Sequence, residues 1–145
     1  MIANGALSYL DAARVLQADP LAASNPFWFC VFQSVELSLK SFLRAKGRSK
    51  EELKARDLGH RLAALYTLAQ TDGLSEHVTL TEDEAALVCA VGEMYSRKVF
   101  QYTEVGWIEL PYAYQAVALA EKLYLAIRPF AEAQRTFHHD KSTAV

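Results

Sequence analysis

The sequence predicts an all-α protein, folded as an up-and-down helical bundle of four long helices plus a short one. Apolar residues recur at three- and four-residue spacing over several long segments, which is the period of a buried helix face. Capping residues stand where these segments begin, and glycine or proline stands where most of them end. Most connections between them are short, and short connections favour antiparallel neighbours.

The first two helices have the clearest boundaries. The first spans about residues 6–18 and stops at Asp19-Pro20, because the residue before a proline avoids helical backbone angles. The second begins at Asn25-Pro26, a capping residue followed by proline at the first helical position, and ends before Gly47. Its predicted core face consists of Trp28, Val31, Phe32, Val35, Leu39, Phe42 and Leu43.

The middle of the chain continues the helical pattern. Ser49-Lys-Glu-Glu52 is a capping box that opens a short helix. A further helix spans about residues 60–70 and is ended by Gly73. Thr81-Glu-Asp-Glu84 is a second capping box, and the helix that it opens runs towards Arg97.

The last part of the chain holds a connection, a helix and a tail. Residues 98–110 are rich in β-branched and aromatic residues, but a single strand has nothing to pair with, so we expect an ordered connection. Pro111 opens the last helix, and Pro129 is expected to kink or close it. We therefore expect one helical domain over residues 1–133 and a flexible tail over residues 134–145.

The composition is that of a globular domain. The 145 residues are 52% apolar and 22% charged, with a net charge of -2, which argues against general coating of polyanions. The sequence lacks the ~20 consecutive apolar residues of a membrane span and the basic start of a signal peptide, so we expect a cytoplasmic protein. Cys30 and Cys89 lie in apolar runs and are expected to be buried thiols, with no metal site and no cofactor.

Three segments, in this order, resemble the HEPN family. They are Phe32-Gln-Ser-Val-Glu-Leu-Ser-Leu-Lys-Ser-Phe-Leu43, Leu58-Gly-His-Arg-Leu62 and Tyr95-Ser-Arg-Lys-Val-Phe-Gln-Tyr102, and the resemblance covers about residues 6–130. It implies a helical bundle that is often dimeric. Members of that family act as ribonucleases, as toxins paired with a small nucleotidyltransferase, or as non-catalytic binders of nucleotides or RNA.

The resemblance departs from the ribonuclease members at one position. Those members place a histidine a short distance after an arginine, whereas here Arg97 is followed, after four residues, by Tyr102. Tyrosine has a pKa near 10 and exchanges protons poorly at neutral pH. We therefore favour a nucleotide- or RNA-binding module of a toxin–antitoxin or defence system over an enzyme. The alternative is a metal-independent ribonuclease toxin in which Arg97 and Tyr102 act together.

The candidate ligand-binding residues fall into two groups. In the first, Arg97 and Lys98 would grip a phosphate while Tyr102 or Trp107 stacks on a base. The plainer interpretation of the two cations is that they complement the negative end of a helix dipole.

The second group consists of Glu36 and Lys40, which would face Arg97 across a cleft, and His60 is a separate candidate. The plainer interpretation of Glu36 and Lys40 is an intrahelical ion pair, worth about 0.3 kcal/mol. His60, at a helix start, would then simply hydrogen-bond to a neighbouring loop.

Three adjacent aromatic residues predict a partner. Phe27-Trp-Phe29 surrounds a helix start, and one helix cannot bury all three rings against a single core face. Because aromatic residues are enriched in interface cores, we expect a homodimer. A small nucleotidyltransferase is a second expected partner, implied by the resemblance, and a helical adaptor without a ligand is the remaining alternative.

Overall fold

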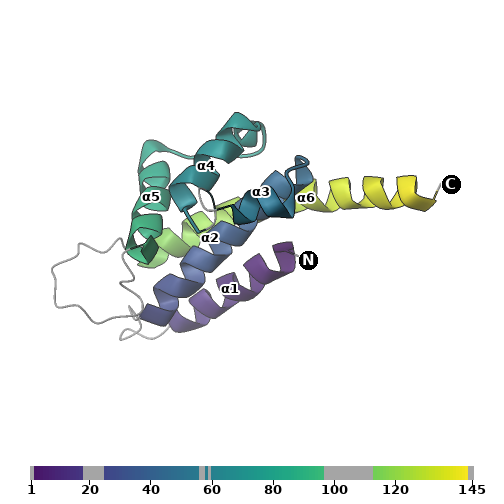
Figure 1. Cartoon of the computed structure of the whole chain (residues 1–145). Coiled ribbons are helices and arrows are strands. Elements are labelled where there is room, and N and C mark those ends of the chain that lie inside the picture. The colour runs from purple at the N-terminus through teal and green to yellow at the C-terminus, as the bar shows by residue number, and fades with distance from the viewer. Residues whose placement is uncertain (1, 18–24, 56–57, 59, 97–112, 144–145) are drawn as a thin grey trace.

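The computed structural model describes residues 2–17, 25–55, 58, 60–96 and 113–143, and these residues form helices with no strand among them (Figure 1). The elements are α1 (Ile2–Gln17), α2 (Asn25–Ala45), α3 (Lys50–Lys54), α4 (Leu62–Thr71), the 3-10 turn η1 (Leu74–Glu76), α5 (Glu82–Ser96) and α6 (Ala113–Thr143). The predicted all-α class is confirmed. The finer arrangement of four long helices plus a short one is not confirmed, because the described residues form six α-helices, among them α4 over the predicted segment of about residues 60–70.

Helix α2 is the centre of the molecule and packs against α1, α4, α5 and α6. Its neighbours bury even its small polar side chains, and the Ser34 hydroxyl donates to the Ala6 carbonyl at 2.9 Å. Gly5 allows α1 to approach closely, since a Cβ there would lie 3.0 Å from Leu37 Cδ1. Helix α1 runs antiparallel to α2, whereas α6 runs in the same direction as α2 (Figure 1). The helices therefore do not alternate strictly in direction as in a simple up-and-down bundle.

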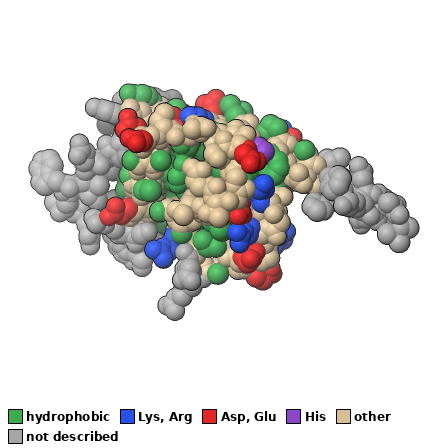
Figure 2. Space-filling view, turned by 90° about the horizontal axis from the view of Figure 1, so that it is seen from above, with side chains coloured by type: hydrophobic (Ala, Val, Ile, Leu, Met, Phe, Trp, Pro, Cys, Tyr) green, Lys and Arg blue, Asp and Glu red, His purple; other side chains and the backbone are tan. Residues whose placement is uncertain are grey.

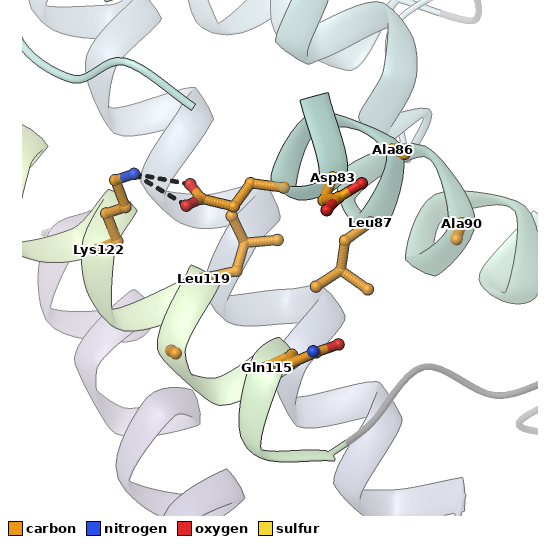
Figure 3. Close-up of a pocket in the computed structure, with 9 residues that line it drawn as sticks. Asp83, Ala86, Leu87, Ala90, Gln115, Leu119 and Lys122 are labelled. Atoms are coloured by element: carbon orange, nitrogen blue, oxygen red, sulfur yellow. Dashed lines mark hydrogen bonds and ion pairs between the residues drawn. The ribbon is translucent and has the colours of Figure 1, made fainter. Parts of the chain in front are cut away.

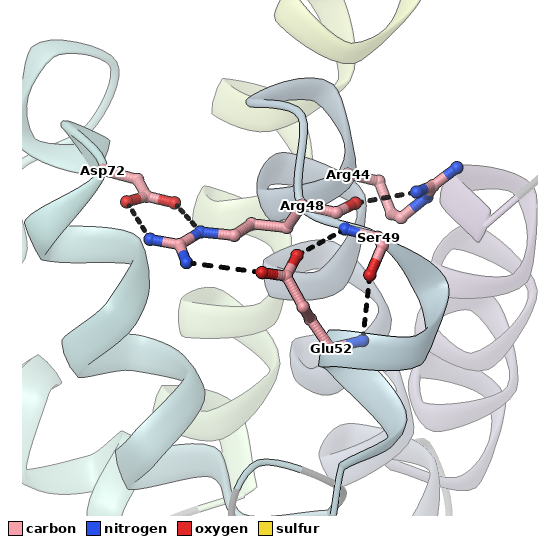
Figure 4. Close-up of polar contacts among 5 residues, drawn as sticks. All are labelled: Arg44, Arg48, Ser49, Glu52 and Asp72. Carbon is pink, nitrogen blue, oxygen red and sulfur yellow. Dashed lines mark hydrogen bonds and ion pairs between the residues drawn. The ribbon is translucent and has the colours of Figure 1, made fainter.

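The end of α2 is fixed by a glycine and an arginine. Gly47 has a φ of 99°, and the Arg48 N–H donates to the Leu43 carbonyl at 3.0 Å, which closes a Schellman motif. The Arg48 side chain then reaches α4, where Nε and Nη2 each lie 2.8 Å from a different oxygen of Asp72 (Figure 4). This fork joins the ends of two helices that are far apart in the sequence.

The two predicted capping boxes have different outcomes. The box at Ser49 is complete: its hydroxyl accepts from the Glu52 N–H at 3.0 Å, and its own N–H donates to the Glu52 carboxylate at 2.7 Å (Figure 4). At Thr81 only the first half is present, with the hydroxyl accepting from the Glu84 N–H at 3.2 Å. The Glu84 carboxylate instead accepts from Lys122 of α6, at 2.7 and 3.0 Å.

The aromatic residues at the start of α2 are accommodated within one chain. Phe27 is fully buried and Trp28 is 2% exposed, while Phe29 is half-buried and lies edge-on to Tyr9 of α1. Because α2 has neighbours on several sides, it buries rings on more than one face. The argument that these rings require a second subunit is therefore wrong, although a homodimer itself stays a prediction.

Two further expectations need correction. Pro129 does not close the last helix, because α6 continues past it to Thr143. A kink at Pro129 and the boundary between the domain and the tail stay predictions. The proline lacks the N–H that would bond to the carbonyl of Leu125, and Leu125 itself is 58% exposed. Cys89 is exposed rather than buried, and Cys30 is half-buried. None of the described helices is long and apolar enough to cross a membrane.

Candidate functional site

A buried carboxylate on α2 is the centre of the candidate site. Glu36 is only 2% exposed, whereas the other buried side chains of α2 are apolar or are serines. Burial of an ionised carboxylate is costly unless charged or hydrogen-bonding partners accompany it. Two partners do so: the ammonium of Lys40, one turn further along α2, and the imidazole of His60, which precedes α4. The side chain of Lys40 is 15% exposed, so this ion pair lies at the edge of the core.

His60 is held in one orientation by this carboxylate. Its Nδ1 lies 3.0 Å from Glu36 Oε1 and 3.2 Å from Oε2. A carboxylate only accepts hydrogen bonds, so Nδ1 carries the donated proton. In the neutral ring Nε2 then has a lone pair, and the side chain is 65% exposed. The structure thus holds the exposed imidazole of His60 in place through a hydrogen bond to a buried carboxylate.

Tyr95, near the end of α5, completes the cluster. Its ring stacks on Phe32 of α2, with centroids 3.7 Å apart and an interplanar angle of 2°, and lies 5.8 Å from the ring of His60. Burial raises the pKa of the Tyr95 hydroxyl, and the nearby negative charge of Glu36 raises it further. Tyr95 therefore keeps its proton at neutral pH and acts as a neutral aromatic wall of the site.

The structure brings one of the two predicted groups together. Glu36 and Lys40 form the expected pair, and His60, which is 24 residues away from Glu36 in the sequence, joins them. Their binding of a ligand stays a prediction. The other group, Arg97, Lys98, Tyr102 and Trp107, lies outside the described residues.

Sequence reasoning overlooked Tyr95 as a site residue. It stood inside one of the family-like segments, but an aromatic residue on an amphipathic helix has the same pattern as an ordinary core residue. Its contact with His60 depends on how α4 and α5 pack, and Gly92 sets that packing. A Cβ at this glycine would lie 2.9 Å from the Cβ of Leu62 at the start of α4.

A groove between α5 and α6 is a second concave feature, with a volume of about 560 Å³ (Figure 3). Its walls are mostly small or apolar side chains, and its polar groups are Asp83, Gln115 and the ion pair between Glu84 and Lys122. No sequence signal marked it, because alanine and leucine are ordinary helix formers. The groove contains none of the predicted site residues that the structure describes.

The face seen in Figure 2 shows no large patch of a single charge among its coloured residues. Acidic and basic side chains alternate there between apolar ones. This pattern agrees with the net charge of -2. Within the described part of the chain, no group of three or more histidine, cysteine or acidic side chains is placed to hold a metal ion.

Comparison with known proteins finds no match to this chain among family models, curated proteins or solved structures.

Proposed function

We propose that this chain is a HEPN-like module that binds a nucleotide or an RNA segment at the cluster of Glu36, Lys40, His60 and Tyr95. One observation carries the proposal. The three segments that resemble the family lie far apart in the sequence, and each contributes to this cluster: Glu36 and Lys40 come from the first, His60 from the second and Tyr95 from the third. This convergence of the three segments supports the proposal.

The chemistry of the cluster suits a phosphate-containing ligand. Lys40 supplies ammonium N–H donors, and Glu36 orients the ring of His60 while balancing the positive charge of Lys40. Arg97 follows Tyr95 by two positions in the sequence, and its planar guanidinium is the group best suited to grip a phosphate. Tyr102 and Trp107 remain the proposed stacking residues for a base.

Isothermal titration calorimetry with ATP, GTP and a short single-stranded RNA tests this proposal. The variants are Arg97→Ala and His60→Gln, with His77→Gln as the matched control. His77 is an exposed histidine whose ring packs on Phe130 and is not part of the cluster. Loss of one charge-assisted hydrogen bond costs about 1.5–3 kcal/mol, so we expect Kd to rise about tenfold or more in the site variants only. Failure to bind any of the three ligands contradicts the proposal, as does binding unaffected by Arg97→Ala and His60→Gln.

A metal-independent ribonuclease is the second candidate, and the orientation of His60 favours it. The family-like segment around Arg97 lacks a histidine, but His60 supplies an imidazole. Its side chain is 65% exposed, and its ring centroid lies 5.8 Å from that of Tyr95. Imidazole is the side chain that most often serves as a general acid or base. Cleavage of structured RNA by the purified protein, lost in both Arg97→Ala and His60→Gln, would favour the ribonuclease over the binding module. Intact RNA after prolonged incubation would exclude cleavage of that substrate.

The proposed setting is a cytoplasmic toxin–antitoxin or defence system, in which the chain forms a homodimer and pairs with a small nucleotidyltransferase. Light scattering at tens of micromolar protein tests the dimer, because it measures mass directly. A monomeric mass would contradict it. Co-purification with a nucleotidyltransferase encoded beside this chain would support the second partner.

A further inference from the structure

His60 combines three properties that go beyond the binding of a ligand. Its side chain is 65% exposed, its Nδ1 is held by a carboxylate that is only 2% exposed, and Lys40 neutralises that carboxylate. Solvent exposure makes Nε2 accessible to a reagent, and the fixed tautomer leaves its lone pair directed away from the carboxylate. These are the requirements of a nucleophilic imidazole.

We propose that Nε2 of His60 accepts a phosphoryl group from a small donor of the acyl phosphate or phosphoramidate class. In the reaction with an acyl phosphate, the Nε2 lone pair forms an N–P bond, and the P–O bond to the acyl oxygen breaks. The carboxylate leaves with the bonding electron pair. With phosphoramidate, which is protonated on its nitrogen, the P–N bond breaks and ammonia leaves with the bonding pair. No proton has to leave the ring, because the only ring N–H proton of the reactive tautomer is the one on Nδ1 that is shared with Glu36.

Glu36 explains why His60 should react in preference to the other histidines. As the N–P bond forms, the imidazole gains positive charge, and the carboxylate 3.0 Å from Nδ1 stabilises it, as an acidic residue does behind a catalytic histidine. Lys40 keeps the pair of Glu36 and Lys40 neutral overall, so the anionic donor does not meet a net negative charge. The inference requires no bound nucleotide and is independent of the proposed function.

The surroundings of His60 also favour a phosphoryl group. The next residue, Arg61, is exposed and is the N-cap of α4, but its side chain makes no capping hydrogen bond. The positive end of the α4 dipole therefore begins beside His60 without a side-chain cap. Arg61 and the start of α4 add to the attraction for a phosphoryl group, whereas the proposal itself depends on the contact between His60 and Glu36.

His77 provides a comparison within the same molecule. It is also exposed, but its ring lies 4.4 Å from Phe130 and 5.7 Å from Phe42, and these neighbours are apolar. A histidine without a carboxylate partner gains no stabilisation as its ring becomes positive. His77 is therefore expected to react at the rate of an ordinary surface histidine.

The experiment incubates the full chain with acetyl phosphate, and in parallel with phosphoramidate, without any nucleotide. Mass spectrometry under neutral conditions follows phosphoryl incorporation, and peptide mapping compares His60 with His77 and with the pair His138-His139. We expect His60 to be labelled about 10- to 100-fold faster than the others, by analogy with the loss of activity when the carboxylate behind a metal-bound histidine is removed. Labelling of His60 at the rate of His77, or no labelling at all, overturns the inference.

Two variants separate the role of the carboxylate from simple exposure. Glu36→Gln keeps the shape of the side chain but removes the charge, and it should slow labelling of His60 by about 10- to 100-fold. His77→Gln should leave the labelling of His60 unchanged. An equal rate in Glu36→Gln and the unmodified protein would refute the role of Glu36. If Glu36→Gln does not fold, the comparison of His60 with His77 in the unmodified chain still decides the inference.

Discussion

Replacement of Lys40 by methionine isolates the energetic role of the buried carboxylate. The change keeps the length and apolar stem of the side chain but removes the ammonium that accompanies Glu36. Removal of one partner from a buried ion pair costs about 3–5 kcal/mol, because the remaining charge is uncompensated. Here the Lys40 side chain is 15% exposed and His60 still donates to the carboxylate, so we expect a smaller loss of about 2–3 kcal/mol.

A double variant shows whether the loss comes from the uncompensated charge or from packing. Glu36→Met combined with Lys40→Met removes both charges, and buried ion pairs replaced by apolar residues are often neutral or stabilising. The lost partner of His60 matters little, because that side chain is 65% exposed and can bond to water. We therefore expect the double variant to be more stable than Lys40→Met alone.

Urea denaturation at neutral pH, followed by circular dichroism, measures both effects. The loss of about 2–3 kcal/mol corresponds to a fall of about 4–12 °C in Tm for a domain of this size. Lys54→Met is the matched control, since Lys54 is an exposed lysine of α3 and its loss should change stability by less than about 0.5 kcal/mol. Equal stability of Lys40→Met and Lys54→Met would refute the reasoning. A double variant less stable than Lys40→Met would refute it too.

Three further outcomes are expected. Arg48→Met should reduce the free energy of unfolding slightly at pH 7, because it removes the ion pair with Asp72. Because Arg48 lowers the pKa of Asp72 below its ordinary 3.8, this contribution is present above that pH and lost as pH falls through the lowered value, so urea unfolding near pH 2 should show a smaller difference. Gly92→Ala should cost about 1–3 kcal/mol, measured in the same way, because the new Cβ would lie 2.9 Å from a side chain of α4. Cys89 should react with a thiol reagent faster than Cys30, because Cys89 is exposed whereas burial raises the pKa of the Cys30 thiol.

The sequence predicts the helices well because their signals are local. The boundaries of α2 follow from Asn25-Pro26 and Gly47, and the box at Ser49 forms as its pattern indicates. The second box fails in part because Glu84 has a partner on α6, 38 residues away in the sequence, which no local pattern reveals. The burial of two adjacent rings at the start of α2 was missed for the same reason, since it depends on the number of helices around α2.

The sequence indicated Glu36, Lys40 and His60 as candidate residues, but it did not predict that His60 contacts Glu36. The four-residue spacing of Glu36 and Lys40 predicts their ion pair, whereas the same spacing normally describes a solvated helix face. That this face is buried, and that His60 reaches it, follows from the position of α4 on α2. No local sequence pattern predicts the groove between α5 and α6, because the same helix-forming residues occur whether two helices diverge or pack closely.

The length of α6 affects how the size of this protein is measured in solution. A helix of 31 residues is about 46 Å long, and its C-terminal end projects past the rest of the bundle (Figure 1). A projecting rod increases hydrodynamic drag, so a single chain should elute from a sizing column ahead of a sphere of equal mass. Elution volume alone would then imitate a dimer, and sedimentation equilibrium or scattered-light intensity is needed to count the subunits.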